Sequence, residues 1–253
     1  MKVAAIQMVS SARLADNLAR AGELIAEAAR GGAELVVLPE YFCLLGQRDT
    51  DKLAIQERFG HGPIQQFLEM AAREHGVWLV GGTLPMTVED CHGAESTGRV
   101  FNSSLAFAPD GRCVARYDKM HLFRFDNGTE RYDEARVLQA GALPQMFELP
   151  SRDGHNWRVG LSVCYDLRFA ELYRHYAAQG ADLLLVPSAF TYGGVRRTGS
   201  CCCEHAPLKT WPASSLRRKG ACTKTVGAPG GTPWWSIPGG WLWVAATLKA
   251  RAW

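Results

Sequence analysis

Apolar residues in the first third of the chain recur with the spacings of helices and of buried strands. Across residues 14–28 they return every three or four positions, which predicts an amphipathic helix that ends at Gly31-Gly32. The same spacing predicts a second helix from Pro63 to Gly76. Short runs of Val, Ile, Leu and Ala predict buried strands at residues 2–7, 35–38 and 77–80.

The middle of the chain continues this alternation of strands and helices. Strands at residues 100–108 and 113–117 are expected on either side of the turn at Pro109-Asp110-Gly111, and a helix is expected over residues 168–179. Further strands are predicted at residues 146–149, 158–163 and 182–187. Residues 121–144 show no sustained period and are expected to form a long loop, of a length more often functional than idle. This succession of elements indicates an α/β sandwich.

The composition is typical of a globular protein with a sizeable core. The chain has 253 residues, of which 47% are hydrophobic and 21% are charged. No apolar run approaches the ~18 residues that a membrane-spanning helix needs. The N-terminus also lacks the layout of a signal peptide. We therefore expect a cytoplasmic protein whose thiols stay reduced and which binds no membrane.

Charge divides the chain at about residue 192. Residues 1–192 have a net charge of −5, whereas residues 193–253 have a net charge of +8. The second segment also holds four of the eight Cys and six of the eight Trp, and neither a helical nor a strand period is sustained there. We therefore expect one domain over residues 1–192, followed by a basic, Cys/Trp-rich tail over residues 193–253 that is not natively folded.

Three polar residues lie where predicted strands end, namely Glu40, Lys119 and Cys164. Each has an ordinary structural interpretation, as a solvated carboxylate, a surface charge and a core thiol respectively. However, α/β sheets gather their sites at strand ends, so the three side chains can converge. A thiol hydrolase is then predicted, in which Glu40 takes the thiol proton. Lys119 and the backbone N–H of Tyr165 would stabilise the oxyanion.

The segments around these three residues resemble the signature segments of the nitrilase superfamily, the carbon–nitrogen hydrolases. The matching segments, in the family's order and spacing, are Leu38-Pro39-Glu40, Tyr117-Asp118-Lys119-Met120-His121-Leu122-Phe123 and Ser162-Val163-Cys164-Tyr165-Asp166-Leu167-Arg168-Phe169. Residues 185–190 resemble the strand that follows the nucleophile in that family. The resemblance implies a four-layer αββα sandwich, here incomplete or disordered at its C-terminal end. It also implies a homodimer and neither a metal nor another cofactor.

The resemblance further implies a reaction. The Cys164 thiolate would attack a small linear amide, and Glu40 would act first as the acid for leaving ammonia and then as the base for water. A second family glutamate, which would orient Lys119 or the substrate, maps onto Glu134, although Glu130 and Asp133 lie close by in the sequence.

The motifs also resemble one branch of the family, which contains the omega-amidases and the deaminated-glutathione amidases. Their substrates are small dicarboxylic monoamides, so an arginine is expected to bind the free carboxylate. Arg124, Arg131 and Arg168 are all candidates for this role, and His121 is expected to pack beside the site.

Residues 193–253 depart from the family, and three interpretations were weighed. A metal site built from Cys201–Cys203, His205 and Cys222 is disfavoured because adjacent cysteines cannot easily ligate one ion tetrahedrally. Nucleic-acid binding through Arg217-Arg218-Lys219 is disfavoured because basic runs are usually only solvated. We favour a frameshift near Gly193, because permitted codons read two bases later can encode a helix that resembles the family's continuation.

Loss of that continuation changes the expected function. At ~25 cal/mol per Å², several hundred Å² of uncovered sheet would cost on the order of 10 kcal/mol, comparable with the whole stability of a domain. The chain as written is therefore expected to be poorly stable, inactive and disordered after about residue 193. The alternative to an amidase is a truncated, non-catalytic nitrilase-like protein that acts at most as an interaction module.

Overall fold

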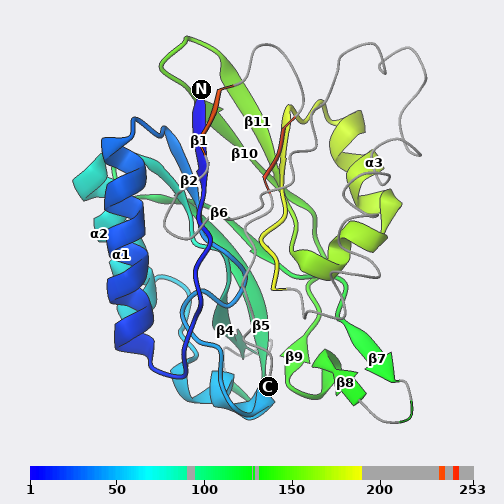
Figure 1. Ribbon diagram of the computed structural model, residues 1–253. Coiled ribbons are helices and arrows are strands. Elements are labelled where there is room, and N and C mark those ends of the chain that lie inside the picture. The colour runs from blue at the N-terminus through cyan, green and yellow to red at the C-terminus, as the bar shows by residue number, and fades with distance from the viewer. Residues whose placement is uncertain (90–94, 127, 129–130, 190–233, 237–241, 245–253) are drawn as a thin grey trace.

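Two β-sheets lie face to face, and each is covered on its outer side by helices (Figure 1). The computed structural model describes residues 1–89, 95–126, 128, 131–189, 234–236 and 242–244. Within them the layers follow the order helix, sheet, sheet, helix. This is the four-layer αββα sandwich predicted from the sequence.

The first sheet is built around three short parallel strands and one long antiparallel strand. Its order is β13-β1-β2-β3-β5-β4, and β6 and β9 also pair with β5. The three strands β1, β2 and β3 are parallel and almost fully buried, which explains why their sequences are continuous apolar runs. The strands are β1 (Lys2–Ala5), β2 (Leu35–Val37), β3 (Trp78–Val80), β4 (Leu84–Glu89), β5 (Glu95–Phe107), β6 (Cys113–Asp118), β9 (Leu138–Gln139) and β13 (Trp234–Ser236).

The second sheet has the order β10-β11-β12-β14. Strands β11 and β12 are parallel, and β10 is the antiparallel hairpin partner of β11. A separate two-stranded hairpin, β7–β8, lies in the segment that was expected to be a loop. The bounds are β7 (Arg124–Asp126), β8 (Arg131–Asp133), β10 (Gln145–Pro150), β11 (Asn156–Leu161), β12 (Leu183–Leu185) and β14 (Leu242–Val244).

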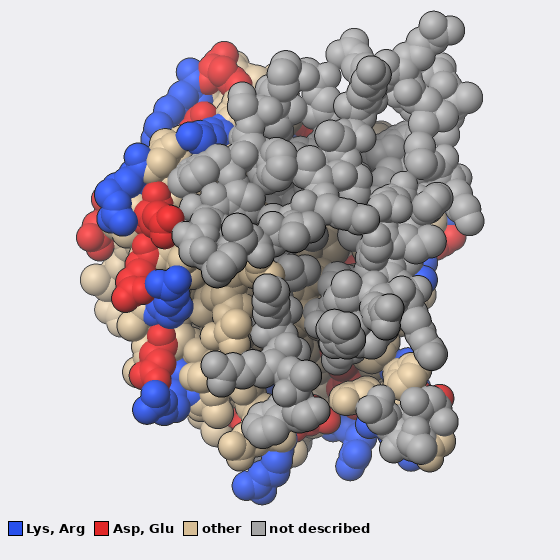
Figure 2. All heavy atoms as spheres, in the orientation of Figure 1, with Lys and Arg blue, Asp and Glu red and all other residues tan. Residues whose placement is uncertain are grey.

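Three α-helices of the described residues form the outer layers. Helices α1 (Leu14–Arg30) and α2 (Pro63–His75) cover the first sheet, and α3 (Ala170–Ala178) covers the second. Charged side chains of both signs alternate along the side of the molecule that α1 occupies (Figure 2). Three 3₁₀ turns complete the described elements, namely η1 (Asp49–Ile55), η2 (Glu134–Arg136) and η3 (Cys164–Arg168). No helix in this part of the chain is long and apolar enough to cross a membrane.

Each pair of adjacent layers encloses its own apolar core. Ile25 and Leu68 of the helices meet Val36 of the first sheet. The middle core lies between the two sheets, and α3 packs on the outer face of the second. Because the middle core joins the two sheets, it fixes the strand ends of one relative to those of the other.

The structure differs from the sequence-based expectations in three local details, the first of which is the β7–β8 hairpin in place of a loop. Helix α3 begins two residues later than predicted, because residues 164–168 form the 3₁₀ turn η3 and Phe169 is extended. Strand β4 was not expected because it contains Pro85, a residue that sheets tolerate at an edge, where β4 lies.

The structure describes two short segments of the tail that begins at residue 193. Residues 234–236 pair with β1, and residues 242–244 pair with β12. The other residues of 193–253 lie outside the described part of the chain.

Candidate active site

Glu40 lies just beyond the C-terminal end of β2 and is 1% exposed. The Asn102 side-chain amide donates to Glu40 Oε1 over 3.0 Å, and the backbone N–H of Ala189 donates to Oε2 over 2.9 Å. Burial raises the pKa of Glu40 above its ordinary value, and the nearby Lys119 charge opposes that rise. A buried carboxyl with a raised pKa is well suited to exchange protons near neutral pH.

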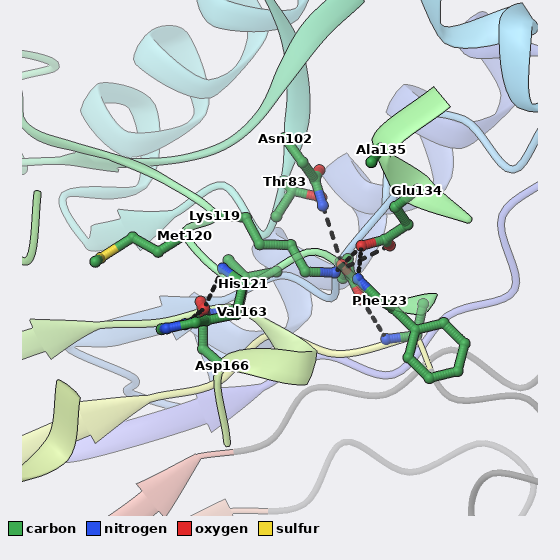
Figure 3. Close-up of polar contacts among 12 residues, drawn as sticks. Thr83, Asn102, Lys119, Met120, His121, Phe123, Glu134, Ala135, Val163 and Asp166 are labelled. Atoms are coloured by element: carbon green, nitrogen blue, oxygen red, sulfur yellow. Dashed lines mark hydrogen bonds and ion pairs between the residues drawn. The ribbon is translucent and has the colours of Figure 1, made fainter. Parts of the chain in front are cut away.

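Lys119 follows β6 and is completely buried. Its ammonium lies 3.1 Å from Glu40 Oε1 and 2.9 Å from Glu134 Oε2, so it sits between two carboxylates (Figure 3). Burial alone would lower the pKa of Lys119, but the two glutamate charges outweigh it and raise the pKa above its ordinary value. The buried lysine therefore remains positively charged.

Glu134 opens the η2 turn and is the acidic residue of this loop that contacts Lys119. Its carboxylate also accepts hydrogen bonds from the Tyr41 hydroxyl over 3.0 Å and from the backbone N–H of Phe123 over 2.7 Å. Neighbouring Asp133 instead caps η2 by accepting from the backbone N–H of Ala135. The other neighbour considered, residue 130, lies outside the described residues.

Cys164 is the first residue of η3, three residues beyond the end of β11. Its φ of +47° lies in the left-handed region, which is uncommon for a residue with a side chain. The Glu40 and Glu134 carboxylates and the Lys119 ammonium all lie near enough to act electrostatically on the thiol. Burial and the Glu40 charge raise the pKa of Cys164 well above its ordinary value despite the opposing lysine. In the substrate-free site the proton therefore remains on sulfur.

The site forms where the ends of the two sheets meet. Glu40 and Lys119 come from the first sheet and Cys164 from the second, and the structure brings them together with Glu134. Tyr165 follows in the first turn of η3, where the turn itself supplies no acceptor for its N–H. The arrangement offers a nucleophile, a proton acceptor and a fixed positive charge around one point.

Comparison of the amino-acid sequence with known protein families identifies its family. The profile of the family described as carbon-nitrogen hydrolase matches residues 2–212. The chain belongs to the carbon-nitrogen hydrolase family.

Relatives in this family include amidases. The chain is 40% identical over 190 residues to the deaminated glutathione amidase of Synechocystis sp., a match that covers 74% of this chain and 66% of the relative. It is 37% identical over 191 residues to the omega-amidase NIT2 of Homo sapiens, covering 75% of this chain and 63% of the relative. The chain thus spans just under two thirds of the length of these relatives.

Solved structures share the fold. The structure of Nit3 from Saccharomyces cerevisiae, a member of branch 10 of the nitrilase superfamily, is 27% identical and superposes with a TM-score of 0.67, covering 83% of this chain and 72% of that one. An amidase from Nesterenkonia sp. AN1, solved with acrylamide added to its active-site cysteine, is 25% identical with a TM-score of 0.58, covering 78% and 71%. The chain therefore has the nitrilase-type sandwich fold.

The three candidate arginines lie in different environments. Arg124 and Arg131 lie on the β7–β8 hairpin and face Asp133 at 3.8 Å and Asp126 at 3.9 Å. Arg168 ends the η3 turn that begins with the candidate nucleophile, is exposed, and has no carboxylate partner among the described residues. Of the three, Arg168 is the one that lies near Cys164 in the chain and has no carboxylate partner within the described part of the structure.

Three residues of this candidate site were not singled out from the sequence. They are Asn102, which contacts Glu40, Tyr41, which contacts Glu134, and Asp166, described below. A polar residue inside the apolar run of β5 was the available signal for Asn102. Among the described residues, no group of three or more His, Cys, Asp or Glu could hold a metal ion. The cysteine-rich group considered as a metal site lies outside them.

Proposed function

We propose that the chain hydrolyses small linear amides to a carboxylate and ammonia through a thioester on Cys164. The observation that carries the proposal is the cluster in which the buried Lys119 contacts Glu40 and Glu134, near enough to Cys164 for these charges to act on its thiol. Membership of the carbon-nitrogen hydrolase family and the amidase relatives support hydrolysis of a carbon–nitrogen bond in general.

Acylation begins with transfer of the thiol proton to Glu40. The Cys164 sulfur forms a bond to the amide carbon, and the carbonyl oxygen becomes an oxyanion. The Lys119 ammonium and the Tyr165 N–H stabilise this negative charge. As the oxyanion collapses, the carbon–nitrogen bond breaks and the Glu40 carboxylic acid returns its proton to the leaving nitrogen, which departs as ammonia.

Deacylation uses the same residues in the reverse direction. Glu40, now ionised, takes a proton from water, and the resulting hydroxide attacks the thioester carbon. The second oxyanion collapses with cleavage of the carbon–sulfur bond, and the proton on Glu40 returns to the Cys164 sulfur. Glu134 keeps Lys119 charged and fixed in place, and it takes no part in proton transfer.

For the substrate we propose a dicarboxylic monoamide whose free carboxylate binds Arg168. The relatives named above are a deaminated glutathione amidase and an omega-amidase, and Arg168 is an exposed arginine, without a carboxylate partner among the described residues, on the turn that carries Cys164. Arg124 on the adjacent hairpin, opposite Asp133, is the matched control.

The test is release of ammonia from succinamate and from uncharged propionamide. We expect turnover of succinamate that the Cys164→Ala substitution abolishes. Arg168→Met should raise KM for succinamate more than for propionamide, whereas Arg124→Met should have little effect on either. No ammonia from either amide, or equal release by Cys164→Ala, would overturn the proposal. Equal effects of Arg168→Met on both amides would overturn the carboxylate role alone.

The second candidate is a truncated, non-catalytic relative. It is favoured by the change of composition after residue 192. We propose that residues 1–192 are the hydrolase domain and that residues 193–253 arise from a frameshift, which resequencing around codons 190–200 tests.

A cytoplasmic homodimer is the expected state, which localisation in cells and light scattering in solution would check.

A further inference from the structure

Asp166 lies at the centre of a second polar cluster, beside the one that holds Lys119. Its side chain is completely buried. Oδ1 accepts from the backbone N–H of His121 over 2.9 Å and lies 2.7 Å from His121 Nδ1. Oδ2 accepts from the Tyr117 hydroxyl over 2.7 Å and from the backbone N–H of Val163 over 2.8 Å. Four donors thus share one carboxylate.

The donors to Asp166 come from the two chain segments that carry Lys119 and Cys164. Tyr117 and His121 lie two residues before and two residues after Lys119, and Val163 immediately precedes Cys164. One carboxylate therefore bonds to the segments that carry the two reacting groups (Figure 3). These segments belong to different sheets, so the contact crosses the interface between the layers.

The same carboxylate holds the turn on which the nucleophile lies. Cys164 has a left-handed φ of +47°, a conformation that persists only when its surroundings impose it. The bond from Val163 N–H to Asp166 Oδ2, together with the 3.0 Å bond from Asp166 N–H to Val163 O, closes the turn around Cys164. The His121 ring stacks on Phe169 at 3.6 Å between centroids, which holds the far end of η3.

We propose that Asp166 is a positioning residue that sets the separation between the Cys164 sulfur and the Lys119 ammonium. It touches neither substrate nor the reacting atoms. It acts by joining the two segments, and through them it controls how far Lys119 stabilises the thiolate and the oxyanion. This inference rests on the proposed function for its catalytic consequence, but its geometric part can be tested without turnover.

The first test is Asp166→Asn, which keeps the shape of the side chain but replaces one acceptor oxygen by a donor. Because a displacement of about 1 Å can cost roughly 100-fold in rate, we expect kcat to fall by about that factor with KM changed by less than about threefold. Alkylation of Cys164 by iodoacetamide at pH 9, followed on its peptide by mass spectrometry, should slow by about tenfold, the effect of one unit in the thiol pKa.

Glu57→Gln is the matched control. Glu57 is also a buried carboxylate that accepts backbone N–H groups, those of Ile64 and Gln65 at the start of α2. Its substitution should lower the melting temperature while the alkylation rate of Cys164 and kcat stay within about twofold of the unsubstituted chain. Alkylation of folded Asp166→Asn at the control rate would overturn the proposal.

A more conservative double substitution tests the proposal if the Asp166→Asn variant does not fold. Tyr117→Phe with His121→Phe removes two side-chain donors but leaves the carboxylate, its backbone bonds and an aromatic ring against Phe169. We expect Cys164 alkylation to slow by a few-fold, and an unchanged rate would overturn the proposal. If alkylation follows these expectations but no amide is turned over, the proposed function fails and the positioning role stands.

Discussion

Removal of the buried ammonium by Lys119→Met should destabilise the fold strongly. Lys119 is completely buried and is paired with Glu40 at 3.1 Å and with Glu134 at 2.9 Å. A pair of opposite charges about 4 Å apart gains roughly 4 kcal/mol at an effective dielectric constant of 20. Breaking a buried pair by removing one partner typically costs about 3–5 kcal/mol. We expect a loss in the free energy of unfolding of roughly 3–5 kcal/mol at pH 8.

The loss in free energy of unfolding caused by Lys119→Met should become smaller as the pH falls. Without the lysine charge, the pKa of Glu40 in the folded variant rises further, because burial and Glu134 remain and the opposing effect is gone. A carboxyl whose pKa is higher in the folded than in the unfolded state binds protons preferentially when folded, so acid stabilises the variant. The difference from the unsubstituted chain should shrink by up to about 1.4 kcal/mol per pH unit towards pH 5.

Urea unfolding of both chains at pH 5 and pH 8 measures these free energies, with trimethylamine N-oxide added to both if the variant is unfolded in water. The control is Arg20→Met, which breaks the exposed pair between Arg20 and Glu23 and should cost less than about 1 kcal/mol at either pH. A Lys119→Met variant as stable as the control, or a loss that does not depend on pH, would refute the electrostatic account of the site.

Three further predictions concern the backbone and the chemistry of the site. Gly82→Ala should lower the free energy of unfolding, measured by thermal melts, by about 3 kcal/mol, because at a φ of +50° the added Cβ would lie 1.9 Å from the backbone oxygen of Pro39. Its control is Gly76→Ala, which has a φ of +59° but open space around it and should lower that free energy by only about 1 kcal/mol. Tyr41→Phe removes a hydrogen bond to the Glu134 carboxylate, so kcat should fall roughly tenfold, and an unchanged kcat would contradict the supporting role of that glutamate. Because burial raises the pKa of Cys164, its alkylation by iodoacetamide without substrate should accelerate by about tenfold per pH unit from pH 7 to pH 9, and a plateau below pH 8 would show a thiolate already formed.

The helices and the strands that carry the site could be predicted from the sequence, because each is encoded locally. Helix α1 has an apolar residue every three or four positions, and β2 is a continuous apolar run, so burial is visible in the pattern itself. The choice of Glu40, Lys119 and Cys164 depended on two further facts, that strand ends gather at one edge of a sheet and that the segments around these residues resemble the signature segments of the nitrilase superfamily.

Part of the support around these residues could not be predicted, because it depends on contacts between distant segments. Asp166 meets His121 and Tyr117 across 45 and 49 residues of chain, and no period or composition marks such a contact. Glu134 was expected from the family resemblance, but the β7–β8 hairpin that returns the chain towards Lys119 was expected only as a loop. Strand β4 was missed for a different reason, since Pro85 weakens the local signal of an edge strand.

The covalent step is the central claim, and mass spectrometry of the acid-quenched chain tests it most directly. The chain would be mixed with succinamate, quenched within its first turnovers and digested, alongside the Cys164→Ala variant. The account predicts a succinyl group on the peptide that contains Cys164, ammonia released in equal amount during the first turnover, and neither product from the variant. Ammonia release without any acyl group on that peptide, or release by the Cys164→Ala variant, would contradict it.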